Sequence, residues 1–226
     1  MHVLDNPIRA SLTSRHRAFA RGDDRVARYP PDVAPFLGIA DGAGDVDARL
    51  AHLVAPGETV YLLGARPPLP AGWGSSGPHS LAQMVCEAPV PEVDGPTITP
   101  LTDAHRDDVL ALTALVYPHY FRPRTMDLGR YFGIYDGGRL AGMIGERMAT
   151  DDWQEISAVC THPDFNGRGL ARRLLAWLGN DILAAGRVPF LHVSNENARA
   201  RALYARNGYR TRVDIDFWSL RRPPAR

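Results

Sequence analysis

The feature that most constrains this sequence is a strand, a glycine-containing turn and a helix that follow one another over residues 155–185. Residues 155–161 have the composition of a strand, bounded before by Asp151-Asp152 and after by His162-Pro163. From about residue 169, leucines recur at helical spacing, and Gly186 then supplies a C-cap. This unit requires a fold in which helices pack on a sheet.

The elements around this unit predict a mixed α/β (α+β) fold. Thr102 is a good N-cap for a helix that ends before Pro118, and two strands at 130–135 and 139–148 flank the turn 136–138. The last elements are expected to be a strand at 190–194, a helix at 197–206 and a strand at 213–220.

A proline-rich stretch at 88–96 predicts an interdomain linker, because proline removes backbone donors and Gly95 adds turn freedom. We therefore expect a smaller α/β domain at 1–95, of unknown role, and a second domain at 96–226. In the first, a helix at 47–54 and a strand at 59–63 are expected, followed by a loop at 66–77. This domain either covers the cleft of the second or is a degenerate partner of it.

The composition excludes some classes of protein. The 226 residues carry a formal charge of +1, so no global field favours nucleic acid or an anionic membrane. Every basic residue is arginine, which excludes a Schiff-base lysine and suggests a bacterial origin. Cys86 and Cys160 are too few for a disulfide framework, and no stretch has the length of a membrane span or signal h-region, so we expect a cytoplasmic protein.

The turn before the 169–185 helix has the properties of an anion site. Unpaired backbone N–H groups gather at the positive end of the helix dipole, and a phosphate can approach closely where Gly167 and Gly169 lack a Cβ. Arg168 and Arg172 add positive charge. The spacing matches neither a Walker loop nor a dinucleotide fingerprint.

At this turn the chain resembles the GNAT superfamily of N-acetyltransferases, whose pyrophosphate loop is Gln/Arg-x-x-Gly-x-Gly/Ala. Gly169 and Ala171 match it, and Asn166 stands where the family usually has Gln or Arg. A second match in the expected order is Asn197-x-x-Ala200-x-x-Leu203-Tyr204-x-x-x-Gly208-Tyr209. In its overall sequence character, the chain most resembles the branch of the family that includes glycine N-acyltransferases.

The resemblance implies a mostly antiparallel central sheet flanked by helices, and acetyl-CoA or another acyl-CoA as co-substrate, with no metal. The donor would be bound by Val159, Cys160, Thr161, Asn166, Gly167, Arg168, Gly169, Leu170, Ala171, Arg172, Asn197 and Tyr204. Cys160 would act through its backbone. His162 and Asp164 flank Pro163 but make a poor metal site without further partners.

The resemblance also gives candidates for the chemistry of acyl transfer to an amine. Tyr204 stands where the family places a tyrosine that donates to the CoA sulfur, which makes it the candidate acid. Glu155 and His192 are candidate bases, with Glu146 as a third. Strand alternation places Glu155 on one face with Ser157, Val159 and Thr161.

The expected function is transfer of an acetyl or acyl group from acyl-CoA to a primary amine of a small molecule, amino acid or peptide, by direct attack in a ternary complex. The alternatives are a non-catalytic acyl-CoA-binding or regulatory module and a nucleotide-binding protein. Arg122, Arg124 and Arg130 raise the hypothesis of an acceptor with a carboxylate, against the plainer interpretation of a solvated loop. Monomer and homodimer both stay open.

Overall fold

The computed structural model describes residues 2–44, 46–116 and 118–225. Its α-helices are α1 (Pro7–Thr13), α2 (Asp47–Leu53), α3 (Arg106–Val116), α4 (Leu170–Ala184) and α5 (Ala198–Arg206). Its strands are β1 (Arg21–Gly22), β2 (Val26–Arg28), β3 (Leu37–Ile39), β4 (Thr59–Leu63), β5 (Gly74–Val85), β6 (Thr99–Leu101), β7 (Tyr131–Asp136), β8 (Arg139–Ala149), β9 (Trp153–Thr161), β10 (Val188–Ser194) and β11 (Arg210–Arg221).

A central sheet of eight strands organises the molecule, in the order β4-β11-β5-β10-β9-β8-β7-β6. All neighbours pair antiparallel except β9 and β10, which run parallel. A smaller antiparallel sheet contains β1, β2 and β3. The mostly antiparallel mixed fold expected from the sequence is thereby confirmed.

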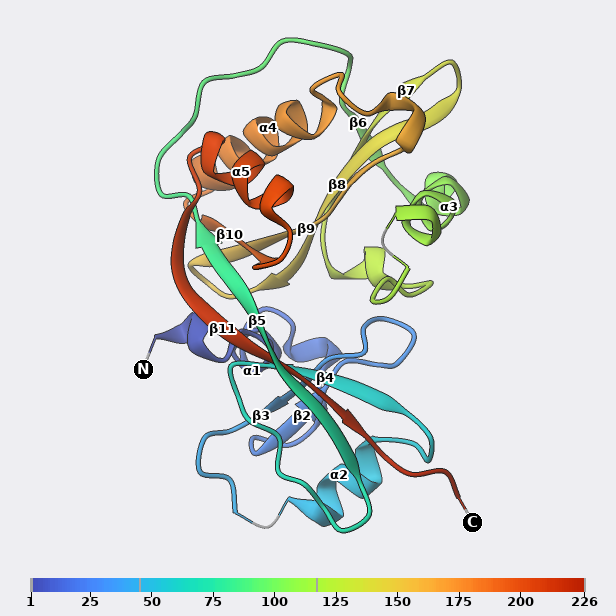
Figure 1. Ribbon diagram of the computed structural model, residues 1–226, viewed down its shortest axis with the longest axis vertical. Coiled ribbons are helices and arrows are strands. Elements are labelled where there is room, and N and C mark those ends of the chain that lie inside the picture. Colours follow the sequence, from blue (N-terminus) through green and yellow to red (C-terminus); the bar gives the residue numbers. More distant parts are fainter. Residues whose placement is uncertain (1, 45, 117, 226) are drawn as a thin grey trace.

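Helices cover both faces of the central sheet (Figure 1). Leu174 and Leu178 of α4 are fully buried in one core cluster with Ile144 of β8 and Ile156 of β9. On the other face, residues of α3 are buried with others of β8 and β9, Cys160 among them. Burying each leucine contributes about 1.5–3 kcal/mol, so the apolar side of α4 fixes this helix on the sheet.

The segment before the proline-rich stretch contributes two strands to the same sheet. β4 pairs with the end of β11, and β5 lies between β10 and β11. In Figure 1, β5 and β11 run side by side between the upper and lower parts of the molecule. The boundary at 95/96 thus falls between strands of one continuous sheet, and the division into two domains stays a prediction.

The sequence-based expectation of a loop at 66–77 is wrong for its last residues, because β5 begins at Gly74. Glycine, serine and proline have poor strand propensity, which hid this strand in the sequence. Its backbone hydrogen bonds to β11 outweigh that propensity. By contrast, the strand expected at 59–63 is β4, and the helix expected at 169–185 is α4 within one residue at each end.

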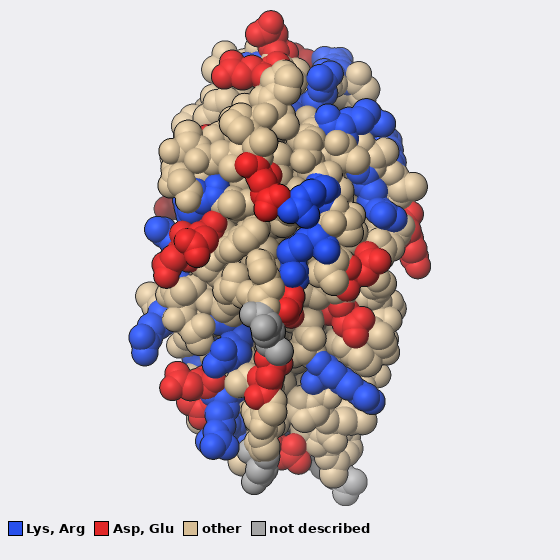
Figure 2. All heavy atoms as spheres, turned by 90° about the vertical axis from the view of Figure 1, so that its left-hand side faces the viewer, with Lys and Arg blue, Asp and Glu red and all other residues tan. Residues whose placement is uncertain are grey.

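Charges are mixed over the surface shown in Figure 2, where arginines and carboxylates lie interspersed. This agrees with the formal charge of +1. In the described part of the chain, the helices are all too short or too polar to cross a bilayer.

Candidate active site

The central sheet opens between its two parallel strands. β9 and β10 pair from Val188 and Trp153 up to Phe190 and Glu155, where the ladder between them ends. Beyond this point β10 continues to pair with β5 on its other side, as far as Ser194 and Leu81. The two strands therefore diverge, and backbone groups of β9 after Glu155 face an opening instead of a neighbouring strand.

A β-bulge at Ala158 lies in this opening. Ala158 has a φ of 49°, and the pairing of β8 with β9 shifts by one residue between Ser157 and Cys160. A positive φ in a residue other than glycine costs free energy, and such strained residues cluster at functional sites. The bulge also breaks side-chain alternation, so that Ile156 and Val159 pack in the same core cluster. The sequence-based placement of Glu155 and Val159 on one face is therefore wrong.

Two cavities meet at the opening. The first, which we call the inner cavity, has a volume of about 650 Å³ and is lined by Ser157 to Cys160, His192 and Tyr204 together with residues of the N-terminal half. The second, which we call the loop cavity, has a volume of about 680 Å³ and extends along the turn 165–172. The two cavities share five lining residues, namely Val116, Val159, Asn197, Ala200 and Tyr204. Tyr204 thus stands at their junction.

The N-terminal half forms part of the wall of the inner cavity. Phe36, Leu63 and the segment from Pro78 to Leu81 all line it. Of the two roles considered for residues 1–95, covering the cleft is the one that agrees with these contacts.

The turn before α4 has a backbone geometry that suits an anion. Gly167 and Gly169 have φ values of 80° and 78°, and a Cβ at either position would meet nothing within 4 Å. Gly169 is the N-cap of α4 and no side chain caps that end, so the first backbone N–H groups of the helix are open to a ligand. The α4 dipole adds to their attraction for a phosphate. Thr161, Asn166, Leu170 and Ala171 line the same cavity.

Arg168 departs from its predicted role. Its guanidinium pairs with Asp136 at 2.7 Å, lies over the ring of Phe165, and is not part of the cavity lining. The guanidinium therefore lies beside Asp136 at the end of β7 and outside the lining of the loop cavity.

Three other arginines line the loop cavity, namely Arg172, Arg199 and Arg206. They make no ion pair within the described residues. Only Arg172 was proposed from the sequence. Arg199 and Arg206 are seven positions apart, two helical turns, and this spacing could have placed them on one side of α5.

The other residues proposed to bind the donor also lie at the opening. Asn197 caps α5 by accepting a hydrogen bond from the N–H of Ala200 at 3.0 Å. Cys160 lines the inner cavity, but its side chain is buried, and burial raises the pKa of its thiol to about 12. Because the thiolate is the nucleophilic form, this raised pKa disfavours Cys160 as a nucleophile near neutral pH.

The candidate base Glu155 is held in a buried ion pair. Arg147 donates to its two carboxylate oxygens at 2.7 and 2.6 Å, and the N–H of Met148 donates to Oε2 at 3.2 Å. Burial raises the pKa of Glu155, but Arg147 and His192 lower it more, to about 2. Glu155 does not line the inner cavity.

The second candidate base, His192, lines the inner cavity but has both ring nitrogens engaged. The amide nitrogen of Gln83 is 2.9 Å from its Nε2, and Glu155 Oε1 is 2.8 Å from its Nδ1. Arg212 donates to Gln83 Oε1, so the amide nitrogen of Gln83 faces His192 as a donor. Nε2 therefore accepts, and Nδ1 carries the proton donated to Glu155. This geometry disfavours Glu155 and His192 as direct proton acceptors.

We expect the Glu155 carboxylate to stabilise the fold most above its ordinary pKa of 4.5. Because the folded-state pKa is depressed, this contribution is lost as the pH falls from about 4.5 toward 2. Urea unfolding of the wild type and Glu155→Gln at several pH values measures it. The free energy of unfolding of the wild type should exceed that of the variant at pH 7 and approach it in acid. A pH-independent difference would contradict this assignment.

The third candidate, Glu146, is also paired. Arg130 bonds its carboxylate at 2.6 Å and contacts Asp181 at 2.7 Å, and Glu146 lines neither cavity at the opening.

His162 accepts a hydrogen bond from the N–H of Asp164 and caps a short helical turn, so the two residues have a local role. Among the described residues, no group of three or more His, Cys, Asp or Glu side chains is placed to hold a metal.

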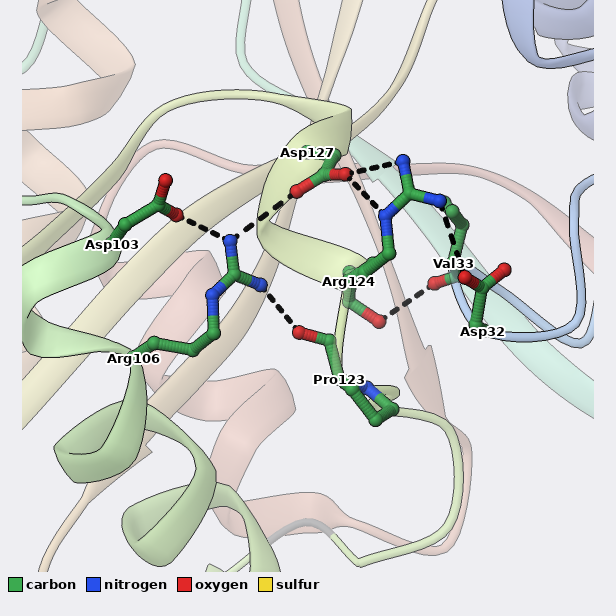
Figure 3. Close-up of polar contacts among 8 residues, drawn as sticks. Asp32, Val33, Asp103, Arg106, Pro123, Arg124 and Asp127 are labelled. Atoms are coloured by element: carbon green, nitrogen blue, oxygen red, sulfur yellow. Dashed lines mark hydrogen bonds and ion pairs between the residues drawn. The ribbon is translucent and has the colours of Figure 1, made fainter.

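Two of the three arginines expected near the acceptor, Arg124 and Arg130, form ion pairs with carboxylates of the chain itself. Figure 3 shows Arg124 between Asp127 and Asp32, the latter at 3.1 Å, next to a similar arrangement around Arg106. Arg130 is paired as described, and Arg122 lines neither cavity. None of the three lines either cavity, so this geometry does not support their binding an acceptor carboxylate.

A sheet opened between two parallel strands, with an uncapped glycine turn at the opening, is the arrangement expected of acetyltransferases that take their acyl group from CoA. Comparisons with known proteins agree. Residues 131–219 match the family model FR47-like protein. A crystal structure of a GNAT-family acetyltransferase from Novosphingobium aromaticivorans is 32% identical and superposes with a TM-score of 0.90, over 100% of both chains. The chain belongs to the GNAT family.

More distant structures share the fold. A GCN5-related N-acetyltransferase from Kribbella flavida gives a TM-score of 0.62 at 16% identity, over 96% of this chain and 94% of the other. A GCN5-related N-acetyltransferase from Sphaerobacter thermophilus gives a TM-score of 0.52 at 16% identity, over 84% of this chain and 73% of the other. A search of curated proteins found no significant match. None of these comparisons singles out the glycine N-acyltransferase branch, which stays a prediction.

Proposed function

We propose that this protein transfers an acetyl or other acyl group from acyl-CoA to a primary amine by direct attack in a ternary complex. The observation that carries the proposal is the junction of the two cavities at Tyr204. A donor in the loop cavity and an acceptor in the inner cavity would meet there without a covalent enzyme intermediate. The buried, unpaired state of Cys86 and Cys160 is in keeping with a reducing cytoplasm.

The residues around the loop cavity fit the pyrophosphate of CoA. The open space at Gly167 and Gly169 and the uncapped start of α4 suit a phosphate group. Arg172, Arg199 and Arg206 provide positive charge for the remaining phosphate oxygens. Val159 to Thr161 would bond the pantetheine arm through the unpaired edge of β9.

In the proposed reaction, the nitrogen of a neutral amine attacks the thioester carbonyl carbon. The C–N bond forms, the C–S bond breaks, and Tyr204 gives its hydroxyl proton to the departing sulfur. The attacking nitrogen passes one proton to water, and Tyr204 regains its proton from water. Backbone N–H groups near the Ala158 bulge would stabilise the carbonyl oxygen as its charge develops. The products are the amide and free CoA.

Isothermal titration with acetyl-CoA, CoA and ATP tests the donor, and release of free CoA in the presence of amines tests turnover. Binding of both CoA species but not ATP, with amine-dependent CoA release, supports the proposal. Binding without CoA release for any amine would favour a non-catalytic binding module. Tight binding of ATP but not of acetyl-CoA would favour a nucleotide-binding protein.

Gly169→Leu should weaken acetyl-CoA binding by about tenfold to a hundredfold, the loss expected when a charge-assisted hydrogen bond to a phosphate is blocked. Gly137→Leu is the matched control, because Gly137 also has a positive φ of 57° and open space around it but lies in the β7–β8 turn. Titration calorimetry should show near-normal affinity for the control. Equal affinity of both variants would remove the cradle assignment.

A further inference from the structure

The inner cavity has an apolar wall that the proposed chemistry does not use. Its members come from the N-terminal half, from the segment after α3 and from β11; they are Phe36, Leu63, Leu81, Tyr120 and Phe217. A volume of about 650 Å³ is ample for a small organic acceptor.

The rings in this wall support one another. Tyr120 meets Phe217 edge to face with ring centroids 5.7 Å apart, and lies 6.3 Å from Phe36. Phe217 in turn stacks on Tyr61 at 5.3 Å with an interplanar angle of 5°. Their mutual contacts limit rotation, so the wall is preorganised. Such a surface favours a flat aromatic ligand over a short aliphatic one.

The charges around the inner cavity differ in how they are compensated. Arg147 and Glu196 are the charged side chains among its described lining residues. The charge of Arg147 is balanced by its two-point ion pair with Glu155. Glu196 is exposed, follows β10 and directly precedes Asn197, and its carboxylate forms none of the ion pairs or hydrogen bonds found in the described structure.

An uncompensated carboxylate attracts an ammonium ion and repels another carboxylate. We propose that the acceptor is a primary amine that carries an aromatic ring and no carboxylate, with its ring against Tyr120 and Phe217 and its ammonium group attracted by Glu196. The ammonium group passes a proton to water before the neutral amine attacks. This inference rests on the proposed acyl transfer and adds the class of acceptor. Glu196 acts as a positioning residue.

Three acceptors separate the contributions: 2-phenylethylamine, phenylalanine, which adds a carboxylate, and propylamine, which lacks the ring. The measurement is kcat/KM for CoA release with acetyl-CoA as donor. We expect 2-phenylethylamine to exceed each of the others by about tenfold or more, the discrimination typical of a single pocket contact. A kcat/KM for phenylalanine or propylamine that equals or exceeds the kcat/KM for 2-phenylethylamine would overturn this inference while leaving acyl transfer intact. Failure of every amine to release CoA would instead count against the proposed function.

Variants test the residues. Glu196→Gln should raise KM for 2-phenylethylamine by about fivefold, the scale of an exposed ion pair, and should lower KM for phenylalanine. The KM for acetyl-CoA should not change. Glu92→Gln is the matched control, since Glu92 is exposed in the proline-rich stretch and lines neither cavity. Identical kinetics for Glu196→Gln and Glu92→Gln would overturn the role of Glu196.

Phe217→Leu keeps an apolar side chain but removes the ring. It should narrow the preference for 2-phenylethylamine over propylamine by about threefold or more, because an aromatic pair contributes about 0.5–1.5 kcal/mol beyond its buried area. Retained affinity for acetyl-CoA by titration calorimetry verifies that the variant is folded. An unchanged ratio in a folded variant would overturn the role of the aromatic wall.

Discussion

Tyr204→Phe should lower kcat by about a hundredfold, the lower range for loss of a general acid, with near-normal affinity for acetyl-CoA. The substitution removes one hydroxyl from the junction of the two cavities and leaves the ring in its contacts with the core. Without that hydroxyl, the thiolate would leave unprotonated, which raises the barrier for breaking the C–S bond. Steady-state kinetics of CoA release and calorimetric titration of acetyl-CoA measure the two quantities separately.

Tyr209→Phe is the matched control. Tyr209 lies edge-on to Tyr204 with ring centroids 6.2 Å apart, is buried, and lines neither cavity. The kcat of Tyr209→Phe should stay close to that of the wild type. Equal kcat for Tyr204→Phe and the wild type would remove the acid role, and equal losses in both variants would indicate a general disturbance of α5.

Arg147→Met should destabilise the fold by about 3 kcal/mol, because it leaves the Glu155 carboxylate buried without its cation. The side chains of Arg147 and Glu155 are 10% and 0% exposed, so water cannot replace the lost contact. The same substitution removes the guanidinium that lies over the ring of Phe36. Urea unfolding near pH 7 measures the change.

Two further variants distinguish this cause from loss of packing. Arg139→Met breaks a surface pair with Asp164, whose partners are 53% and 62% exposed, and should cost less than about 1 kcal/mol. Adding Glu155→Gln to Arg147→Met removes the unpaired charge and should recover part of the stability. A cost as small as that of Arg139→Met, or no recovery in the double variant, would contradict the buried-charge explanation.

The proposed donor side of the site could be located from the sequence because its signals are local. The glycines at 167 and 169 and the start of α4 are contiguous in the chain, and the backbone forms the cradle. Tyr204 followed from a short motif on one helix. The same reasoning failed for Arg168, because its partner Asp136 is brought near by the β7–β8 hairpin.

The proposed acceptor side could not be located from the sequence because its residues come from distant parts of the chain. Phe36, Tyr120 and Phe217 meet only when β4, β5 and β11 join one sheet across the proline-rich stretch. The β5 strand that makes this junction begins in a run of glycine and serine with little strand propensity. No periodicity in the sequence relates these three rings.

By itself, the sequence determined the family and the order of the main helices and strands from residue 102 onward, since each depends on side chains close together in the chain. Only the tertiary structure decided the ionisation of Glu155 and the hydrogen-bond partners of His192. Arg147 reaches Glu155 from β8, and a pKa depends on such neighbours in space. Gln83, which accepts from Arg212, reaches His192 from β5. The opening between β9 and β10 and the bulge at Ala158 likewise arise from strand pairing, which no single segment contains.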